Sequence, residues 1–484
     1  MSAVPPSTRK VGLVTCVFLV LAIVVGNGIY TNLGLQLLSI SSDFTLLVLW
    51  FIGGICALCG ALSYAELSSL MPHSGGEYYY LSRIYHPALG TTGGIMTQYG
   101  GMIAPTALAS MAFAKYVSGI FPAYHPTLIA VALVTIITGT HLINLGFSAG
   151  FQDTITTLKF FLIGTIIFLG FRYATQSPTI FLPTSSSLKE LFSPSSGVTL
   201  LFCYYAYAGW SSATYIADDV SSSRKTVGRS LIIGTLLATL IYLSMNAVFL
   251  MSAPNEELRG VIDIGHVVAT HLLGTQGGNV MALLIALGLM AGVSGMIWVG
   301  PSITQMMGKD LPALTFFDHV TRSNVPMRAM LLQYVLVVLL LLTSSFKIVL
   351  VSSQFTLICC QILTVFGVST LRRKEFSSES QEVRTPSQLT DLCNVEGASK
   401  AQTSNIQNAF KEASSGTTQQ LAAAVELGKQ SIFRCPFYPL PQIIFIGISL
   451  LALGYTLITN PFESMIGIGV ILFGLMLYPL FRRG

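Results

Sequence analysis

Two of the long hydrophobic segments in this chain are interrupted near their middle. The first is broken by Gly26, Asn27 and Gly28, and the second, five segments later, by Ala208 and Gly209. A bilayer supplies no hydrogen-bond partners, so a helix breaks at membrane depth only where protein or a water-filled cavity satisfies the freed backbone groups. Paired breaks present half-helix N-termini to an anion and unwound carbonyls to a cation. The pattern therefore predicts a membrane transporter for a zwitterionic solute.

The composition points to the membrane as well. Of the 484 residues, 52% are hydrophobic and only 9% are charged, whereas soluble domains carry about 25% charged residues. Windows of about 20 apolar residues predict twelve spans, at 11–38, 44–70, 92–121, 126–147, 148–171, 197–220, 228–253, 277–307, 327–345, 346–371, 437–459 and 461–482. We therefore expect an all-α polytopic membrane protein with twelve transmembrane helices.

The basic residues predict how the chain is oriented in the membrane. Most of the 25 Lys and Arg residues fall in the N-terminus, the C-terminus and alternate loops, and loops rich in Lys and Arg stay cytoplasmic. Both termini are therefore expected to be cytoplasmic, in a cell inner membrane of the bacterial type. The net charge of +5 follows from this topology, so the expected partner is the lipid bilayer and not a nucleic acid.

One polar segment divides the membrane body. Residues 1–374 are expected to hold spans one to ten, residues 375–431 to form a polar cytoplasmic insertion, and residues 432–484 to hold the last two spans. The insertion is rich in Ser, Thr, Gln, Ala and Glu and has few large apolar residues, so it cannot bury much of a core. One or two surface helices are predicted within 401–430. A regulatory role and a merely tolerated insertion both remain open.

A single lysine lies deep inside the fifth span. An unpaired cation is costly in a membrane, which makes Lys159 a candidate functional residue, and snorkelling towards an interface is the alternative. The seven histidines form no HExxH or paired-ligand pattern, so neither a metal site, nor a cofactor, nor an enzymatic reaction centre is predicted. Glycines around Asn27 would let a ligand approach the backbone, although close helix packing explains such glycines equally well.

Six motifs, taken in order, make the chain resemble the amino acid/polyamine/organocation superfamily of permeases, particularly the bacterial amino-acid permeases and the L-type exchangers. They are GNGIY at 26–30, SYAELSSLMPHSGGEYYYL at 63–81, QDTITTLKF at 152–160, YAYAGWSSATYIADDV at 205–220, GPSITQMMGKDLP at 300–312 and CPFYPLP at 435–441. The resemblance implies a five-plus-five inverted repeat of the leucine-transporter type. Its halves would be residues 11–171 and 197–371, with spans one and six unwound around a midplane site.

The same resemblance implies roles for individual residues. Backbone N–H groups around Gly26, Asn27 and Gly28 would hold the substrate carboxylate. Carbonyls near Val24, Tyr205 and Ala208 would take its ammonium group. Tyr205 would also act as the gating aromatic, and Ser211 would lie near the side-chain pocket. Asn27 stands where the family usually has serine, which leaves the backbone role intact and puts any hydroxyl role in doubt.

In relatives, a lysine at the position of Lys159 places its ammonium group where sodium-coupled transporters of this fold hold a sodium ion. The expected function is therefore sodium-independent secondary transport of amino acids by alternating access. Neutral substrates are favoured, because spans one, three, six, eight and ten show no evident carboxylate for a cationic side chain. A basic amino acid or polyamine antiporter is one alternative, and a non-transporting amino-acid sensor is the alternative from another class.

Some eukaryotic relatives carry a heavy chain on a cysteine between spans three and four. The corresponding loop here, residues 119–127, contains no cysteine. No disulfide-linked heavy chain is therefore expected.

Overall fold

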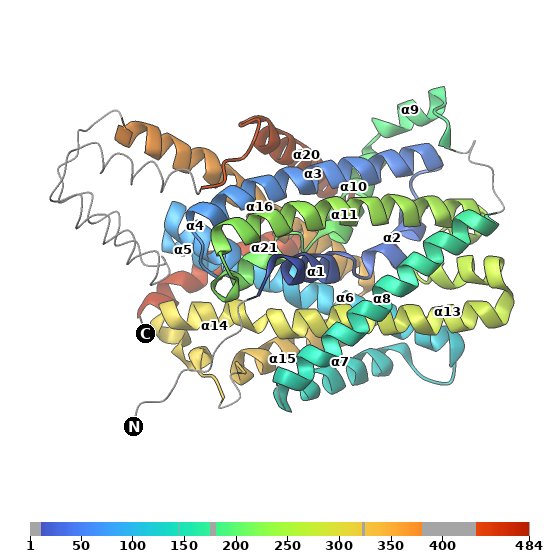
Figure 1. Ribbon diagram of the computed structural model, residues 1–484, viewed down its shortest axis with the longest axis horizontal. Coiled ribbons are helices and arrows are strands. Elements are labelled where there is room, and N and C mark those ends of the chain that lie inside the picture. Colours follow the sequence, from blue (N-terminus) through green and yellow to red (C-terminus); the bar gives the residue numbers. More distant parts are fainter. Residues whose placement is uncertain (1–10, 144, 175–180, 322–324, 380–431, 484) are drawn as a thin grey trace.

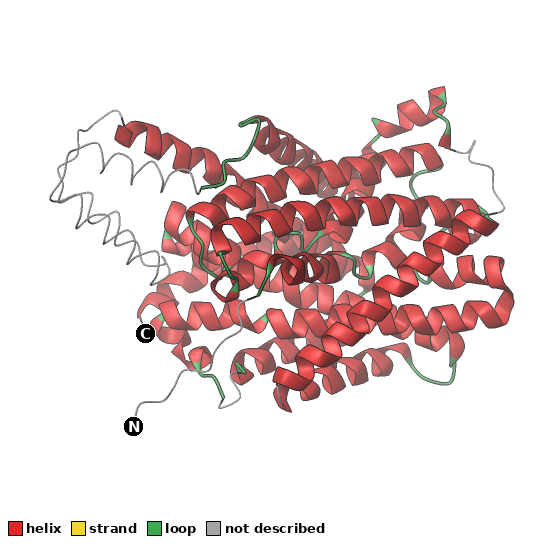
Figure 2. Ribbon diagram, viewed as in Figure 1, coloured by secondary structure: helices red, strands yellow, loops and turns green. Residues whose placement is uncertain are grey.

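The computed structural model describes residues 11–143, 145–174, 181–321, 325–379 and 432–483. These residues form helices joined by loops, and no strand occurs among them (Figure 2). Eight helical segments in this part of the chain are long and apolar enough to cross a membrane, and two shorter apolar helices accompany them at Pro126–Leu142 and Met327–Thr343. The described part of the chain is thus all-helical, and its apolar helices are those of a multi-pass membrane protein. The total of twelve spans stays a prediction, because the other expected spans correspond to short or interrupted helices.

The first part of the chain contains the interrupted first span and a second irregular helix. Its elements are α1 (Leu13–Val24), α2 (Gly28–Gln36), α3 (Asp43–Leu70), α4 (Gly76–Ile84), α5 (Pro87–Thr97), the π-helix η1 (Gln98–Ile103), α6 (Ala104–Ile120), α7 (Pro126–Ile143) and α8 (Leu145–Tyr173). Because α5, η1 and α6 follow one another directly, the expected third span starts earlier than residue 92 and has a π-helical turn in its middle. Such turns are frequent at functional sites.

The second part repeats the interruption. Its elements are α9 (Ser185–Leu191), α10 (Pro194–Tyr207), the 3-10 helix η3 (Ser212–Asp219), α11 (Ser223–Ser252), α12 (Asn255–Leu258), α13 (Ile264–Val299), α14 (Pro301–Asp310), η4 (Pro312–Asp318), α15 (Met327–Thr343), α16 (Phe346–Glu379), α20 (Leu440–Thr459) and α21 (Pro461–Arg483). The helix α13 is kinked at Gly274, where the backbone is not helical, so a first helix runs from Ile264 and a second one follows Gly274, close to the expected start of the eighth span at 277. Ile264 and Val268 are buried, so this part of the expected loop packs as helix.

Most of the long helices run along the longest axis of the molecule, and α8 crosses the others obliquely (Figure 1). The most extensive packing joins α3 to α11 and α6 to α13. The ends of α1, α2 and α10 at the two breaks lie in the middle of this bundle. Apolar side chains from nearly every helix form the core around them.

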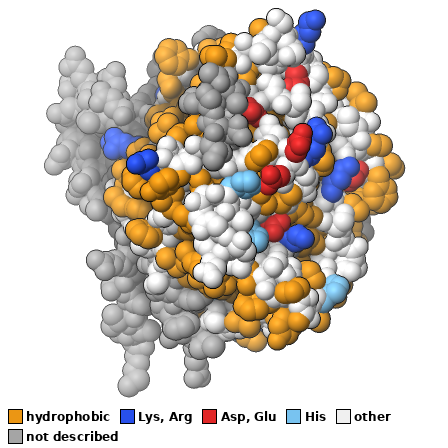
Figure 3. All heavy atoms as spheres, turned by 90° about the vertical axis from the view of Figure 1, so that its right-hand side faces the viewer, with side chains coloured by type: hydrophobic (Ala, Val, Ile, Leu, Met, Phe, Trp, Pro, Cys, Tyr) orange, Lys and Arg blue, Asp and Glu red, His pale blue; other side chains and the backbone are white. Residues whose placement is uncertain are grey.

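The end of the molecule that carries α9 shows how the surface is divided. Acidic, basic and histidine side chains gather near the middle of this end, and hydrophobic side chains surround them (Figure 3). Many large apolar side chains on the sides of the bundle are exposed, among them Phe161, Phe168 and Met476. An apolar belt beside a polar end is the surface that a bilayer requires.

The polar insertion can be described only at its borders. The helix α16 continues to Glu379, five residues beyond the expected border at 374, and the described chain resumes at residue 432. The surface helices predicted within 401–430 lie outside the described residues.

Candidate functional site

The two helix breaks meet in the centre of the bundle. The helix α1 ends at Val24 and α2 begins at Gly28, while α10 ends at Tyr207 and η3 begins at Ser212. A Cβ atom on Gly28 would lie 2.7 Å from the Cα of Ala206. Gly209 has a φ of 105°, and a Cβ atom there would lie 2.6 Å from Cγ2 of Ile23. Glycine is therefore required at both contacts, because each break packs directly against the other.

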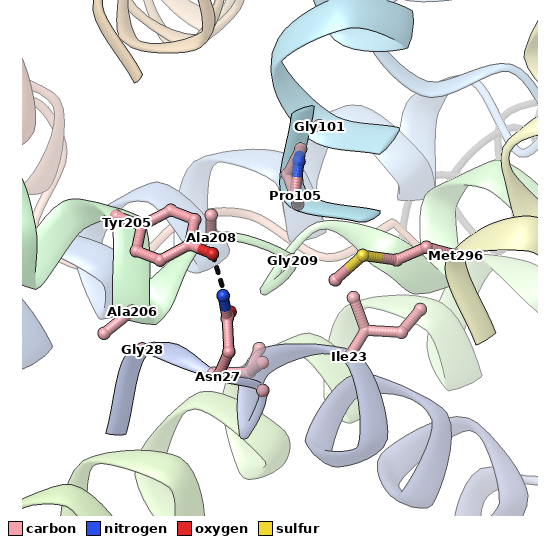
Figure 4. Close-up of a pocket in the computed structure, with 12 residues that line it drawn as sticks. Ile23, Asn27, Gly28, Gly101, Pro105, Tyr205, Ala206, Ala208, Gly209 and Met296 are labelled. Atoms are coloured by element: carbon pink, nitrogen blue, oxygen red, sulfur yellow. Dashed lines mark hydrogen bonds between the residues drawn. The ribbon is translucent and has the colours of Figure 1, made fainter. Parts of the chain in front are cut away.

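A cavity lies between the breaks (Figure 4). It is lined by Ile23, Val24, Gly26, Asn27, Gly28, Gly101, Pro105, Tyr205, Ala206, Ala208, Gly209 and Met296. None of these side chains carries a charge. The backbone and the polar side chains of Asn27 and Tyr205 therefore supply the polar groups that could recognise a ligand here.

The start of α2 forms the donor-rich side of the cavity. The first turn of a helix leaves its N–H groups without intrahelical acceptors, and no backbone acceptor is seen in the described chain for the N–H groups of Asn27, Gly28 and Ile29. The Tyr205 hydroxyl donates a 2.6 Å hydrogen bond to Oδ1 of Asn27. The amide Nδ2 of Asn27 is buried and has no hydrogen-bond partner among the described residues. This side of the cavity can therefore bind a carboxylate through several N–H donors.

A tyrosine of α11 joins the two breaks from behind. The hydroxyl oxygen of Tyr242 lies 2.5 Å from the carbonyl oxygen of Val24 and 2.6 Å from that of Ala206. The Val24 carbonyl also accepts a 2.6 Å hydrogen bond from the N–H of Gly26. The single hydroxyl proton of Tyr242 can be donated to only one of the Val24 and Ala206 carbonyls at a time, whereas the carbonyl of Ala208 has no donor within the described ranges.

Lys159 supports the first break from the side of α8. Its side chain is 1% exposed, and its ammonium nitrogen donates hydrogen bonds of 2.7 Å to the carbonyl of Ala22 and 2.8 Å to that of Val25. These carbonyls belong to the end of α1 and to the break itself. The lysine therefore points into the protein and does not reach an interface.

Six of the seven residues expected at the substrate site line the cavity. They are Val24, Gly26, Asn27, Gly28, Tyr205 and Ala208. The seventh, Ser211, is buried behind the cavity, with its hydroxyl 3.3 Å from that of Tyr215.

Six residues that contribute to the site were not predicted from the sequence: Ile23, Gly101, Pro105, Ala206, Tyr242 and Met296. The sequence offered two signals for some of these residues. One is a tyrosine inside the apolar span of α11, and the other is the Gly-Gly-Met-Ile-Ala-Pro run inside the third span. No group of three or more His, Cys, Asp or Glu side chains that could hold a metal ion occurs in the part of the chain that the structure describes.

Comparisons with known proteins point in one direction. The sequence profile of the family described as Amino acid permease matches residues 11–386. The large neutral amino acids transporter small subunit 2 of Homo sapiens is 25% identical over 351 residues, which cover 69% of this chain and 64% of that protein. The Asc-type amino acid transporter 1 of Homo sapiens is 25% identical over 379 residues, covering 75% and 71%.

A bacterial protein is similar over a larger share of its length. The serine/threonine exchanger SteT of Bacillus subtilis (strain 168) is 25% identical over 377 residues, covering 76% of this chain and 84% of that protein. By contrast, the chain spans less than two thirds of the human large neutral amino acids transporter subunit, at 64% of its length.

Proposed function

The chain belongs to the amino acid permease family, and from this premise we propose that it is a secondary transporter of amino acids that works by alternating access. The observation that carries the proposal is the contact between the two breaks around one cavity. Half-helix termini at the centre of a membrane bundle are the elements that bind zwitterionic substrates in transporters of this kind. Such a protein moves its substrate and does not transform it.

We assign the carboxylate of the substrate to the N–H groups of Asn27 and Gly28 and to the side-chain amide of Asn27. The ammonium group then faces the carbonyl of Ala208 and the break that follows Tyr205. The Val24 carbonyl already accepts from the N–H of Gly26 and lies against the Tyr242 hydroxyl, so it is less available to the ammonium group than the Ala208 carbonyl. Tyr205 lies over this space and acts as the gate that covers a bound substrate.

The uncharged lining favours neutral amino acids. A cationic side chain would need an acidic partner or several oriented carbonyls in a cavity of low dielectric. The twelve lining residues supply no carboxylate, which disfavours a basic amino acid or polyamine antiporter. Met296, Pro105 and Ile23 instead offer apolar contacts for the substrate side chain.

We propose that the membrane body is a five-plus-five inverted repeat. The pairs α3 with α11 and α6 with α13 pack most extensively, and their members are five expected spans apart. The interrupted spans, α1–α2 and α10–η3, have the same separation. Residues 11–171 and 197–371 would then form the two halves, residues 375–431 the cytoplasmic insertion, and residues 432–484 the last two of twelve spans. Rocking of one half against the other around the cavity would provide alternating access.

The positive-inside rule favours cytoplasmic N- and C-termini and an external location for α9 and α12. The proposed location is a bacterial-type inner membrane. Residues 119–127 contain no cysteine, so we propose that the protein works without a disulfide-linked heavy chain. Non-reducing gels of the native membrane provide the check, and a covalent heterodimer would contradict the proposal.

Lys159 supports sodium independence. Its ammonium group already donates to two carbonyls at the first break. A sodium ion coordinated at the same carbonyls would place two cations within contact distance of each other, which is strongly unfavourable in a buried site.

The test is uptake of radiolabelled amino acids into proteoliposomes that contain the purified protein. We expect neutral amino acids to enter without sodium, and unlabelled neutral amino acids to compete with them. Competition by lysine, arginine or polyamines alone would favour the cationic alternative. Substrate binding without flux under any gradient or internal substrate would instead identify a sensor.

A further inference from the structure

The inference concerns Glu77, a carboxyl group buried on the cytoplasmic side of the cavity. Glu77 lies in the first turn of α4, and its side chain is fully buried. Its oxygen Oε1 accepts a 3.0 Å hydrogen bond from the hydroxyl of Tyr64. Its oxygen Oε2 accepts hydrogen bonds of 2.9 Å from the hydroxyl of Tyr215 and 3.4 Å from that of Thr97. Three hydroxyls from three different elements therefore converge on this carboxyl.

No cation faces the Glu77 carboxyl within the described ranges. The ionisable groups around it are Tyr64 of α3, Tyr80 of α4, Tyr215 of η3 and Cys360 of α16. On the α5 side, the uncharged Thr97 faces the carboxyl. The other buried acid nearby, Glu66, is paired with Arg372. A buried carboxylate without a cation is costly, and the neutral acid avoids this cost. Burial raises the pKa of the Glu77 carboxyl, and the hydrogen bonds from its own backbone N–H and from the hydroxyls of Tyr215, Tyr64 and Thr97 lower it by less.

A chain of hydroxyl groups connects Glu77 to the second break. The Tyr215 hydroxyl lies 2.9 Å from Oε2 of Glu77 and 3.3 Å from the hydroxyl of Ser211. Ser211 directly precedes η3 and follows Gly209 by two residues, and Gly209 lines the cavity. Hydroxyl groups both donate and accept, so the chain works in two directions.

The segment around Glu77 also closes the cytoplasmic side of η3. A Cβ atom on Gly76 would collide with the ring of Tyr215, and Gly76 has a φ of 51°, so only glycine fits this close approach. Further out, the N–H of Ser74 donates to Asp218 at 3.1 Å and the N–H of Asp218 donates to the Ser74 hydroxyl at 3.0 Å. Glu77 and Tyr215 thus form the inner layer of a contact that has to open when the cavity opens to the cytoplasm.

We propose that Glu77 is a proton-binding site through which the transport of amino acids is coupled to proton entry. The inference rests on the proposed transport function. A proton that reaches Ser211 from the cavity side passes along the chain: Ser211 gives its hydroxyl proton to Tyr215, and Tyr215 gives its own to Oε2 of Glu77. Each hydroxyl loses one proton and gains one, so the only net change is the conversion of a carboxylate to a carboxylic acid.

Release follows from the same geometry. When η3 moves away from α4, water reaches Glu77, the ionised form becomes solvated, and the proton leaves to the cytoplasm. The buried state holds the proton and the opened state releases it, which makes proton release and substrate release two consequences of one movement.

The first experiment measures proton and substrate movement together in proteoliposomes. An external neutral amino acid is added to vesicles that contain a trapped pH-sensitive dye, and uptake of the labelled amino acid is followed in parallel. For the wild type we expect internal acidification during uptake and faster uptake when the outside is acidic. Glu77→Gln keeps a hydrogen-bonding side chain of the same shape without the titratable group, so it should lose both effects while retaining exchange of external for internal amino acid. The control, Glu256→Gln, alters an exposed acid of α12 and should behave as the wild type.

Tyr215→Phe tests the path in a variant that keeps the acid. It removes the hydroxyl between Ser211 and Glu77, so acid-driven uptake should fall to the level of exchange alone. Unchanged proton entry in Glu77→Gln would overturn the proposal. Wild-type exchange without any proton movement would also overturn it, and would leave the proposed transport function intact.

A second measurement does not depend on transport. The ring of Trp210 packs edge-on against that of Tyr64 with 4.7 Å between centroids, so its fluorescence should respond to the charge on Glu77. We expect a pH titration in the purified protein with a midpoint above about 4.3, the value for a solvated glutamate. The titration should vanish in Glu77→Gln and in Trp210→Phe. If the wild type moves no amino acid at all, the proposed transport function fails. The fluorescence titration still tests the proton site in that case, because a titration that persists unchanged in Glu77→Gln would refute proton binding at this residue.

Discussion

The hydroxyl of Tyr205 donates a 2.6 Å hydrogen bond to the side-chain oxygen of Asn27, and this bond joins the two helix breaks across the cavity. It also fixes the orientation of the Asn27 amide. With Oδ1 held by Tyr205, Nδ2 is buried and has no partner in the described part of the chain, so a substrate carboxylate would give this donor an acceptor. The tyrosine thereby orients a group that we assign to substrate binding.

Removing this hydroxyl should weaken substrate binding. In Tyr205→Phe the aromatic cover remains, but the Asn27 amide is free to turn away from the carboxylate. The loss of one neutral hydrogen bond corresponds to about 1 kcal/mol, or a roughly fivefold higher KM for uptake. Tyr204→Phe is the matched control, because its hydroxyl contacts Cys56 and Ser449 on the opposite side of α10. An unchanged KM in Tyr205→Phe would remove the orienting role.

Shortening the same residue tests the gate. Tyr205→Ala also removes the ring that covers the cavity, so we expect the maximal rate of uptake to fall more than the affinity measured by equilibrium binding. Equal losses of rate and affinity would argue that Tyr205 contributes contacts only.

Lys159→Met should strongly reduce uptake. The substitution keeps an unbranched side chain but leaves the carbonyls of Ala22 and Val25 without their charged donor. Two hydrogen bonds from a charged group, each worth about 1.5–3 kcal/mol, hold the end of α1 and the break in place, so uptake should fall by more than about tenfold. Uptake is measured with and without sodium, and Lys115→Met, at an exposed position of α6, is the control. Sodium-dependent uptake by the wild type would contradict the assignment of Lys159.

Tyr242→Phe should slow uptake with little change in folding. Its hydroxyl reaches the carbonyls of Val24 and Ala206 and so couples the two breaks from the side of α11. The phenyl ring retains the edge-on contacts with Trp50 and Tyr207, which keeps the packing intact. The rate of uptake and the melting temperature are measured together. Slower uptake together with a clearly lower melting temperature would indicate a structural role alone.

The sequence predicts the parts of the site that depend on local chain chemistry. Glycine and asparagine inside apolar segments mark breaks, and α1 ends and α2 begins around Gly26 and Asn27. A lysine in an apolar span marks a buried cation, and Lys159 is buried. These features follow from backbone freedom and from the cost of charge in an apolar surrounding, both of which are readable from a short stretch of residues.

The remaining parts depend on tertiary packing. Met296 and Pro105 reach the cavity because α13 and α6 pack against each other beside the breaks, and nothing in their own segments distinguishes them from other apolar residues. The role of Ser211 near the side-chain pocket, implied by the family resemblance, stays a prediction. Its contact with the hydroxyl of Tyr215, at 3.3 Å, likewise depends on tertiary packing. The helix that precedes the kink at Gly274 was not predicted, because its burial at Ile264 and Val268 comes from tertiary contacts.

An ion pair between α3 and α16 provides a prediction about stability. Arg372 of α16 donates two hydrogen bonds of 2.7 Å to the fully buried carboxylate of Glu66 in α3, and the N–H of Cys435 donates a third, also at 2.7 Å. The same carboxylate therefore ties α3 to the chain before and after residues 380–431.

Arg372→Met should destabilise the protein more than Glu66→Gln combined with Arg372→Met. The single substitution leaves the Glu66 carboxylate buried without its cation, at a cost of about 3–5 kcal/mol, whereas the double substitution removes the uncompensated charge. Thermal unfolding in detergent compares the two, with Arg373→Met, at the neighbouring exposed position, as the control. A double variant that melts below Arg372→Met would mean that Glu66 stabilises the fold through Cys435 and not through the ion pair.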